Sequence, residues 1–155
     1  MRIIKVLSIV VLALTFFSCE PTYEKEYSWA FPLSGDWKVN AFVDGNEVGG
    51  PYEIKIYNSS FGQDSIWIDD YATTSSNGHF WSMKFKAKAN MTSKTFETTG
   101  SKNAIKNYGI IIKLTNGRVI ENDSITMDLE FSDDAGTIYQ LKGRRIVSYD
   151  DYMGN

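Results

Sequence analysis

The sequence has one cysteine, Cys19, and one histidine, His79, among its 155 residues. One cysteine cannot form a disulfide within the chain, and the two residues together cannot supply the ligand set of a structural zinc site. Long apolar runs are also lacking. A helix that spans a membrane needs roughly 20 apolar residues, and the apolar run at residues 6–17 is too short for this. We therefore expect neither a disulfide framework nor a metal site, and no cofactor.

Basic residues are also scarce. Lys and Arg number 16 against 19 Asp and Glu, which gives a formal net charge of -3. Nucleic-acid binding calls for clustered basic side chains, so we expect no nucleic-acid partner. Apolar residues, in contrast, are abundant: 43% of the chain is hydrophobic and 14% is aromatic. This composition is sufficient for one domain with a packed core.

The amino terminus has the pattern of a secretory signal. Residues 1–5 form a short basic start, and residues 6–17 are almost entirely apolar. Cys19 follows this run, and the spacing resembles the lipobox of bacterial lipoproteins, in which the cysteine becomes the acylated first residue of the mature chain. We expect residues 1–18 to be a lipoprotein signal peptide and Cys19 to be the lipidation site. The alternative is an incidental cysteine near an ordinary cleavage site.

An acylated Cys19 would hold the protein at a bilayer through its acyl chains. We therefore expect a lipid-anchored protein of the bacterial cell envelope, in the outer membrane, on its periplasmic or surface side. Residues 19–32 show no strand or helix period and are interpreted as a tether. Its aromatic residues, including Trp29 and Phe31, are alternatively expected to dock on the domain.

From Leu33 onward, apolar and polar residues alternate with the period of two that is typical of strands with one buried face. Residues 37–43 and the longest alternating stretch, residues 79–88, show it most clearly. Asn116-Gly117 is the strongest short hairpin signal and predicts a turn after the strand at residues 108–114. No window of a dozen residues has a helical period.

Roughly eight or nine strands, with turns about every 8 to 12 residues, predict an antiparallel all-β domain over residues 33–152, either a sandwich or a closed barrel. Asp69 and Asp70 follow one of these strands and are expected to be solvated at its end. His79 is expected to be a partly exposed structural residue at a strand entrance.

Gly35-Asp36-Trp37 looks like the Gly-x-Trp element of lipocalins and related calycin barrels. In that family the Trp packs across the closed end of the barrel, and a basic residue of the last strand covers it. Arg145 shares its face of the last expected strand with apolar residues, so the resemblance implies that its guanidinium covers Trp37. The alternative is an ordinary core Trp and a solvated Arg.

A longer resemblance spans about residues 33–151. It is carried, in order, by Leu33-Ser34-Gly35-Asp36-Trp37, Ser65-Ile66-Trp67-Ile68-Asp69-Asp70, Asn116-Gly117-Arg118-Val119-Ile120, Asp123-Ser124-Ile125 and Gly143-Arg144-Arg145. These stretches resemble a family of bacterial envelope lipoproteins called lipid-binding putative hydrolases. The resemblance implies an antiparallel lipocalin-like (calycin) barrel of about eight strands on a lipid anchor. It brings no catalytic motif that can be mapped onto this chain.

Such a barrel has room inside for its own side chains or for one small ligand. One interpretation is a cavity that binds a small apolar ligand such as a lipid or fatty acid. The residues expected to line it are Trp81, Met83, Phe85, Ile112, Met127, Leu129, Phe131 and Tyr139. The same residues would also fill a solid barrel. The protein would then be a non-catalytic accessory or interaction lipoprotein that uses outer aromatic residues such as Trp67, Tyr71 and Phe80.

An esterase-type hydrolase is the third interpretation. It needs a serine on a constrained turn, a histidine base and an oxyanion hole, and the sequence has no Gly-x-Ser-x-Gly elbow. His79 is the single candidate base, and its serine partner would have to come from elsewhere in the fold. We therefore assign no catalytic residue.

Overall fold

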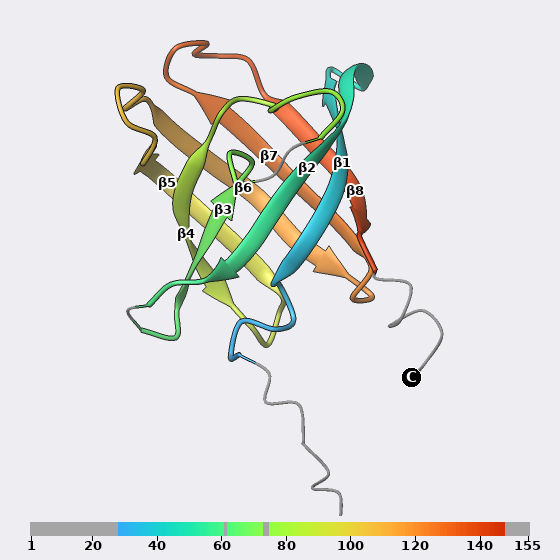
Figure 1. Cartoon of the computed structure of the whole chain (residues 1–155), viewed down its shortest axis with the longest axis vertical. Coiled ribbons are helices and arrows are strands. Elements are labelled where there is room, and N and C mark those ends of the chain that lie inside the picture. Colours follow the sequence, from blue (N-terminus) through green and yellow to red (C-terminus); the bar gives the residue numbers. More distant parts are fainter. Residues whose placement is uncertain (1–27, 61, 73–74, 148–155) are drawn as a thin grey trace, which may run out of the picture.

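The computed structural model describes residues 28–60, 62–72 and 75–147. They form eight antiparallel strands that close into one barrel (Figure 1). The strands are β1 (Gly35–Val43), β2 (Asn46–Asn58), β3 (Ser65–Asp69), β4 (Lys84–Asn90), β5 (Thr95–Lys102), β6 (Ile111–Ile120), β7 (Ser124–Phe131) and β8 (Tyr139–Arg145). Each strand pairs with the next, and β8 pairs with β1. The expected all-β antiparallel barrel of about eight strands is confirmed.

The alternating pattern builds the core directly. In β7, every second residue is buried, because successive side chains of a strand point to opposite faces of the sheet. Every strand contributes at least one buried apolar residue to this core. Each large apolar side chain buried in this way contributes roughly 1.5–3 kcal/mol. No helix in the described ranges is long and apolar enough to cross a membrane.

The two ends of the barrel differ. We call "base" the end that carries residues 28–34, the β4–β5 turn and the β6–β7 turn, and "mouth" the opposite end with the β3–β4 and β7–β8 loops (Figure 1). Residues 28–34 lie across the base, and Ala30 and Leu33 are fully buried there. The indole Nε1 of Trp37 donates to the Leu33 carbonyl at 3.3 Å.

Arg145 holds this base closed. Its guanidinium carbon lies 4.2 Å from the centre of the Trp37 ring. It donates from Nη1 to the Ser34 carbonyl, from Nη2 to the Pro32 carbonyl at 3.2 Å, and from Nε to the Asn122 carbonyl at 2.8 Å. Gly35 has a φ of 139°, and a Cβ there would lie 2.6 Å from Nη1 of Arg145. Glycine therefore gives both the backbone conformation and the room for the guanidinium.

The prediction of a hairpin turn at Asn116-Gly117 is wrong, because both residues lie inside β6. The pairing with β7 shifts register between Thr115 and Arg118, which marks a bulge. A Cβ on Gly117 would collide with the backbone carbonyl of Phe96 on β5, so glycine serves close strand approach here. The actual β6–β7 turn contains Glu121 and Asn122, with φ of 50° and 67°.

The long alternating stretch at residues 79–88 is a strand only from Lys84 onward. Ser82 has a φ of 50°, which interrupts an extended chain. The N–H groups of Trp81 and Met83 donate to the carboxylate of Asp70. The first part of this stretch therefore belongs to the β3–β4 loop.

Candidate functional site

Six of the eight residues expected to line a ligand cavity have no exposed surface at all. These are Met83, Phe85, Ile112, Met127, Leu129 and Phe131, all at 0%. No space as large as a water molecule therefore borders their side chains. The other two, Trp81 and Tyr139, are half-buried and pack against this core. The fold brings all eight residues together, and in this conformation they fill the barrel.

A cluster of aromatic rings closes the mouth. Trp81 from the β3–β4 loop stacks on Phe131, with ring centres 4.3 Å apart and planes at 6°. Tyr139 lies 5.0 Å from Trp81, and Phe80 lies 5.6 Å from Tyr139. We call these four residues the mouth cluster. Aromatic pairs of this kind contribute roughly 0.5–1.5 kcal/mol beyond the area they bury.

Asp70 fixes the loop that supplies Phe80 and Trp81. Its side chain is fully buried and accepts the N–H of Trp81 at 2.8 Å and that of Met83 at 2.5 Å. Burial raises the pKa of this carboxyl, because it penalises the charged form, while the backbone N–H donors counter the rise. The expectation that Asp70 is solvated is therefore wrong.

Asp69 is also buried, at 1% exposure, so the same expectation fails for it. It accepts the Tyr57 hydroxyl at 2.9 Å and lies 3.2 Å from Nζ of Lys84. Its other oxygen accepts the N–H groups of Tyr71 and Ala72. The hydrogen bonds to Tyr57 and Asp69 raise the pKa of Lys84. Asp69 thus fixes the start of the β3–β4 loop, and Asp70 fixes its end.

The three aromatic residues expected on the outer surface lie in different places. Tyr71 is exposed. Phe80 is half-buried in the mouth cluster. Trp67 is on the outer wall, with Nζ of Lys84 at 5.5 Å and that of Lys86 at 5.0 Å from its ring centre. These positions form no single aromatic contact surface.

His79 lies on the exposed side of the β3–β4 loop. Its Nδ1 is 2.6 Å from the backbone carbonyl oxygen of Asp70, and its ring stacks on Tyr71 at 5.2 Å. Nδ1 of His79 thus contacts a backbone carbonyl, and not the serine hydroxyl that the esterase interpretation requires. In the part of the chain that the structure describes, no three His, Cys, Asp or Glu side chains gather to hold a metal ion.

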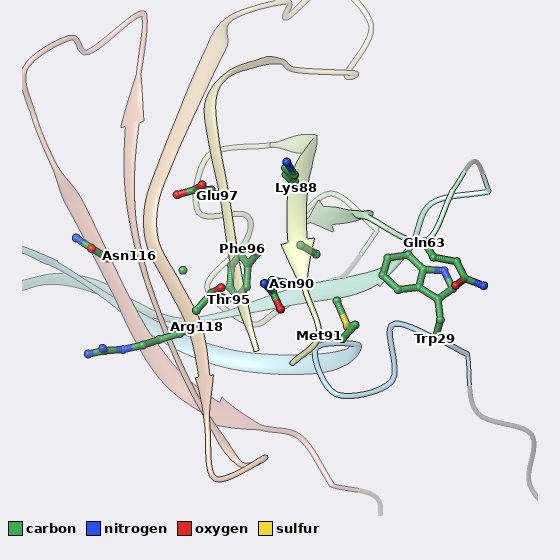
Figure 2. A pocket seen from close by; sticks show the side chains of 12 residues that line it. Trp29, Gln63, Lys88, Asn90, Met91, Thr95, Phe96, Glu97, Asn116 and Arg118 are labelled. Carbon is green, nitrogen blue, oxygen red and sulfur yellow. The ribbon is translucent and has the colours of Figure 1, made fainter. Parts of the chain in front are cut away.

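A hollow lies at the base, outside the barrel core. It has a volume of about 950 Å³. We call it the base groove; its lining residues are Trp29, Gln63, Lys88, Ala89, Asn90, Met91, Thr95, Phe96, Glu97, Asn116, Gly117 and Arg118. Figure 2 shows Trp29 and Gln63 at one end of this row and Asn116 and Arg118 at the other.

Irregular pairing of β4, β5 and β6 produces the base groove. β4 and β5 pair only at three positions, from Lys88 to Asn90. The pairing of β5 with β6 shifts register after Phe96. Gly117 contributes no side chain beside the Phe96 ring, and residues 28–34 supply Trp29 as the far wall. Trp29 is half-buried and packs against the barrel core. This agrees with the alternative expectation that aromatic residues of the tether dock on the domain.

The base groove is chemically mixed. Trp29, Met91 and Phe96 supply apolar surface, while Lys88 and Arg118 supply positive charge. Glu97 lies opposite Lys88 in the register of β4 and β5, so the groove also has an acidic residue. Arg118 has no ion pair with any residue of the described ranges. An apolar surface with a cation at one end suits an amphipathic molecule with an anionic head.

Sequence reasoning missed the base groove because its lining comes from three strands and the N-terminal segment. The one local signal was the tryptophan in the tether. Comparison with known families adds an independent observation: a family model described as "Lipid-binding putative hydrolase" matches residues 22–150, which is most of the chain. No curated protein matches the sequence.

Proposed function

Since the chain belongs to the lipid-binding putative hydrolase family, we propose that it binds a lipid, and that the lipid lies in the base groove rather than inside the barrel. The observation that carries this proposal is the combination, in one hollow of about 950 Å³, of apolar walls and Arg118, which has no ion-pair partner among the described residues. This volume is in the range of ligand sites in proteins, roughly 300–1,000 Å³.

The packed interior supports the groove over a central cavity. Six of the eight inner residues have no exposed surface, so a ligand inside would have to displace them. Forcing additional volume into a packed core costs about 1–3 kcal/mol or more for even small groups. The base groove is already open and needs no such displacement.

The arrangement supports one orientation for the ligand. An acyl chain lies along Met91 and Trp29, and an anionic head, such as a carboxylate, lies at Arg118. We further propose that Cys19 is acylated, so that the protein works at an envelope bilayer with its base groove close to the source of the ligand. This part rests on the lipobox-like sequence around Cys19.

The test is native mass spectrometry and calorimetry with the mature chain carrying Cys19→Ser and a mixture of fatty acids and phospholipids. We expect a stoichiometric added mass. Met91→Asp should weaken binding by about tenfold or more, because the substitution removes a buried apolar contact worth roughly 1.5 kcal/mol or more. Arg118→Gln should weaken the binding of a fatty acid but leave the binding of a neutral monoacylglycerol unchanged.

The matched control is Ile138→Asp, an equally drastic change at an exposed apolar residue of the mouth. It should leave the affinity as it is. A mass without ligand in every lipid mixture would refute lipid binding and leave a filled barrel that acts through its outer face. Binding that resists both groove variants would place the site elsewhere.

A further inference from the structure

The base carries a rim of exposed apolar side chains. Phe31 is 50% exposed, Ile120 44%, Ile146 41% and Val147 52%. The other four large hydrophobic residues that are exposed in the described chain lie toward the mouth: Val48, Tyr71, Ile111 and Ile138. We call the first four residues the base rim. Exposed apolar side chains that gather in one region indicate a surface that contacts a partner.

Backbone contacts bring the base rim together from distant parts of the sequence. The N–H of Ile146 donates to the Asp36 carbonyl at 2.7 Å, beside the segment that carries Phe31. The N–H of Arg145 donates to the Asp123 carbonyl, and that of Asp123 to the Ile120 carbonyl. The β6–β7 turn, the end of β8 and the N-terminal segment therefore form one end surface.

The position of the chain ends indicates what covers this surface. The described chain begins at Ser28 and ends at Val147, and both lie at the base (Figure 1). Cys19 precedes Ser28 by nine residues, which can span at most about 30 Å. An acyl anchor at Cys19 would keep the base, and not the mouth, near the bilayer.

Basic side chains lie on the outer wall that leads to the base. Lys38, Lys142 and Arg144 line a shallow hollow between β1 and β8. Arg144 lies 3.9 Å from Asp123, so the base carries charges of both signs. Basic side chains beside an apolar rim fit lipid phosphates at the bilayer surface.

We propose that the base rim rests on the bilayer and inserts its apolar side chains among the lipid headgroups, so that the base groove opens directly onto the membrane. The proposal rests on the acyl anchor of the proposed function, but not on ligand binding in the groove. The partner is a lipid surface, and Trp29 and Met91 lie where a lipid passing from it would first meet the protein.

The experiment uses the acylated full chain in vesicles of phosphatidylethanolamine and phosphatidylglycerol that contain a brominated phosphatidylcholine. An environment-sensitive fluorophore is attached to a new cysteine in Val147→Cys or, as the matched control, in Ile138→Cys, which is 48% exposed at the mouth. The thioether at Cys19 does not react with the label. We expect a blue shift and bromine quenching for position 147 only.

Three results would overturn the proposal: no quenching at position 147, equal quenching at positions 147 and 138, or protein that does not float with the vesicles. A second variant gives independent support. Ile120→Asp should reduce quenching at position 147 at least twofold, while fatty-acid affinity of the Cys19→Ser chain in solution stays unchanged. Quenching without any fatty-acid affinity would uphold the docking surface and refute the proposed function.

Discussion

At the scale of single residues, two carboxylates of the β7–β8 loop accept hydrogen bonds from aromatic side chains at the mouth. The Tyr139 hydroxyl donates to Asp134 at 2.6 Å, and that of Tyr108 donates to Asp133 at 2.6 Å. The indole Nε1 of Trp81 donates to Asp133 at 3.4 Å. The hydrogen bond to Asp134 raises the pKa of Tyr139 to about 12, with a smaller contribution from burial.

We predict that Tyr139 ionises later than an ordinary tyrosine in an alkaline absorbance titration. Its pKa in the unfolded chain is about 10. Because the folded value is higher, the contact stabilises the fold fully below about pH 10, and this stabilisation is lost as the pH rises toward about 12.

Asp134→Asn removes the carboxylate and should return the pKa of Tyr139 toward 10. The control, Asp133→Asn, removes the carboxylate that Tyr108 contacts and should change the pKa of Tyr139 much less. A Tyr139 titration that is the same in the chain with Asp134→Asn would show that the contact is absent in solution.

At the scale of elements, the alternating pattern placed most strands, while the loops were decided by buried polar groups. Residues 79–83 read as strand because their side chains alternate. They form a loop because Asp70 offers their N–H groups a carboxylate within reach, and buried N–H groups require a partner. The same accounting applies throughout the described residues, where every buried side-chain N or O atom has a hydrogen-bond partner.

We predict that Asp70→Ala destabilises the protein by roughly 2–4 kcal/mol. The substitution leaves the buried N–H groups of Trp81 and Met83 without their acceptor, and each such loss costs about 1–3 kcal/mol. Urea denaturation followed by tryptophan fluorescence measures the change. Asp64→Ala, at an exposed position, should change the free energy of unfolding by less than about 0.5 kcal/mol. Equal stability of the two variants would contradict the role assigned to Asp70.

At the scale of the whole molecule, the barrel closes where β8 meets β1. Gly143 pairs with Val39 on β1 and with Ile125 on β7. A Cβ on Gly143 would collide with the backbone carbonyl of Lys38. Closure removes the free strand edges that would otherwise pair with other chains.

We predict that Gly143→Ala separates β1 from β8 and costs about 3 kcal/mol, in the range of overpacking that backbone shifts must relieve. Hydrogen exchange of the β1 and β8 amides should accelerate together. Gly100→Ala is the control, because its Cβ would meet a flexible side-chain methyl of Ile111 at 3.3 Å. Slow exchange at β1 in the chain with Gly143→Ala would show that the barrel tolerates the methyl group.

The alternating pattern was sufficient to predict an antiparallel all-β domain, because a period of two fixes which face of each strand is buried. The closed barrel and the guanidinium over Trp37 were implied only by the resemblance to lipocalins and to the lipid-binding family, and the structure shows both. The burial of Asp69 and Asp70 and the place of Asn116-Gly117 inside β6 were not predictable in this way.

Only the tertiary structure decided whether the barrel is filled and where a hollow remains. Side-chain volumes can be compared with the space between strands only once all eight strands are in register, and a shift between β5 and β6 is invisible in either strand alone. The base groove exists because that shift, Gly117 and Trp29 meet at one place. The sequence determined the fold through repeated local preferences, whereas the candidate binding site depends on contacts between segments far apart in the chain.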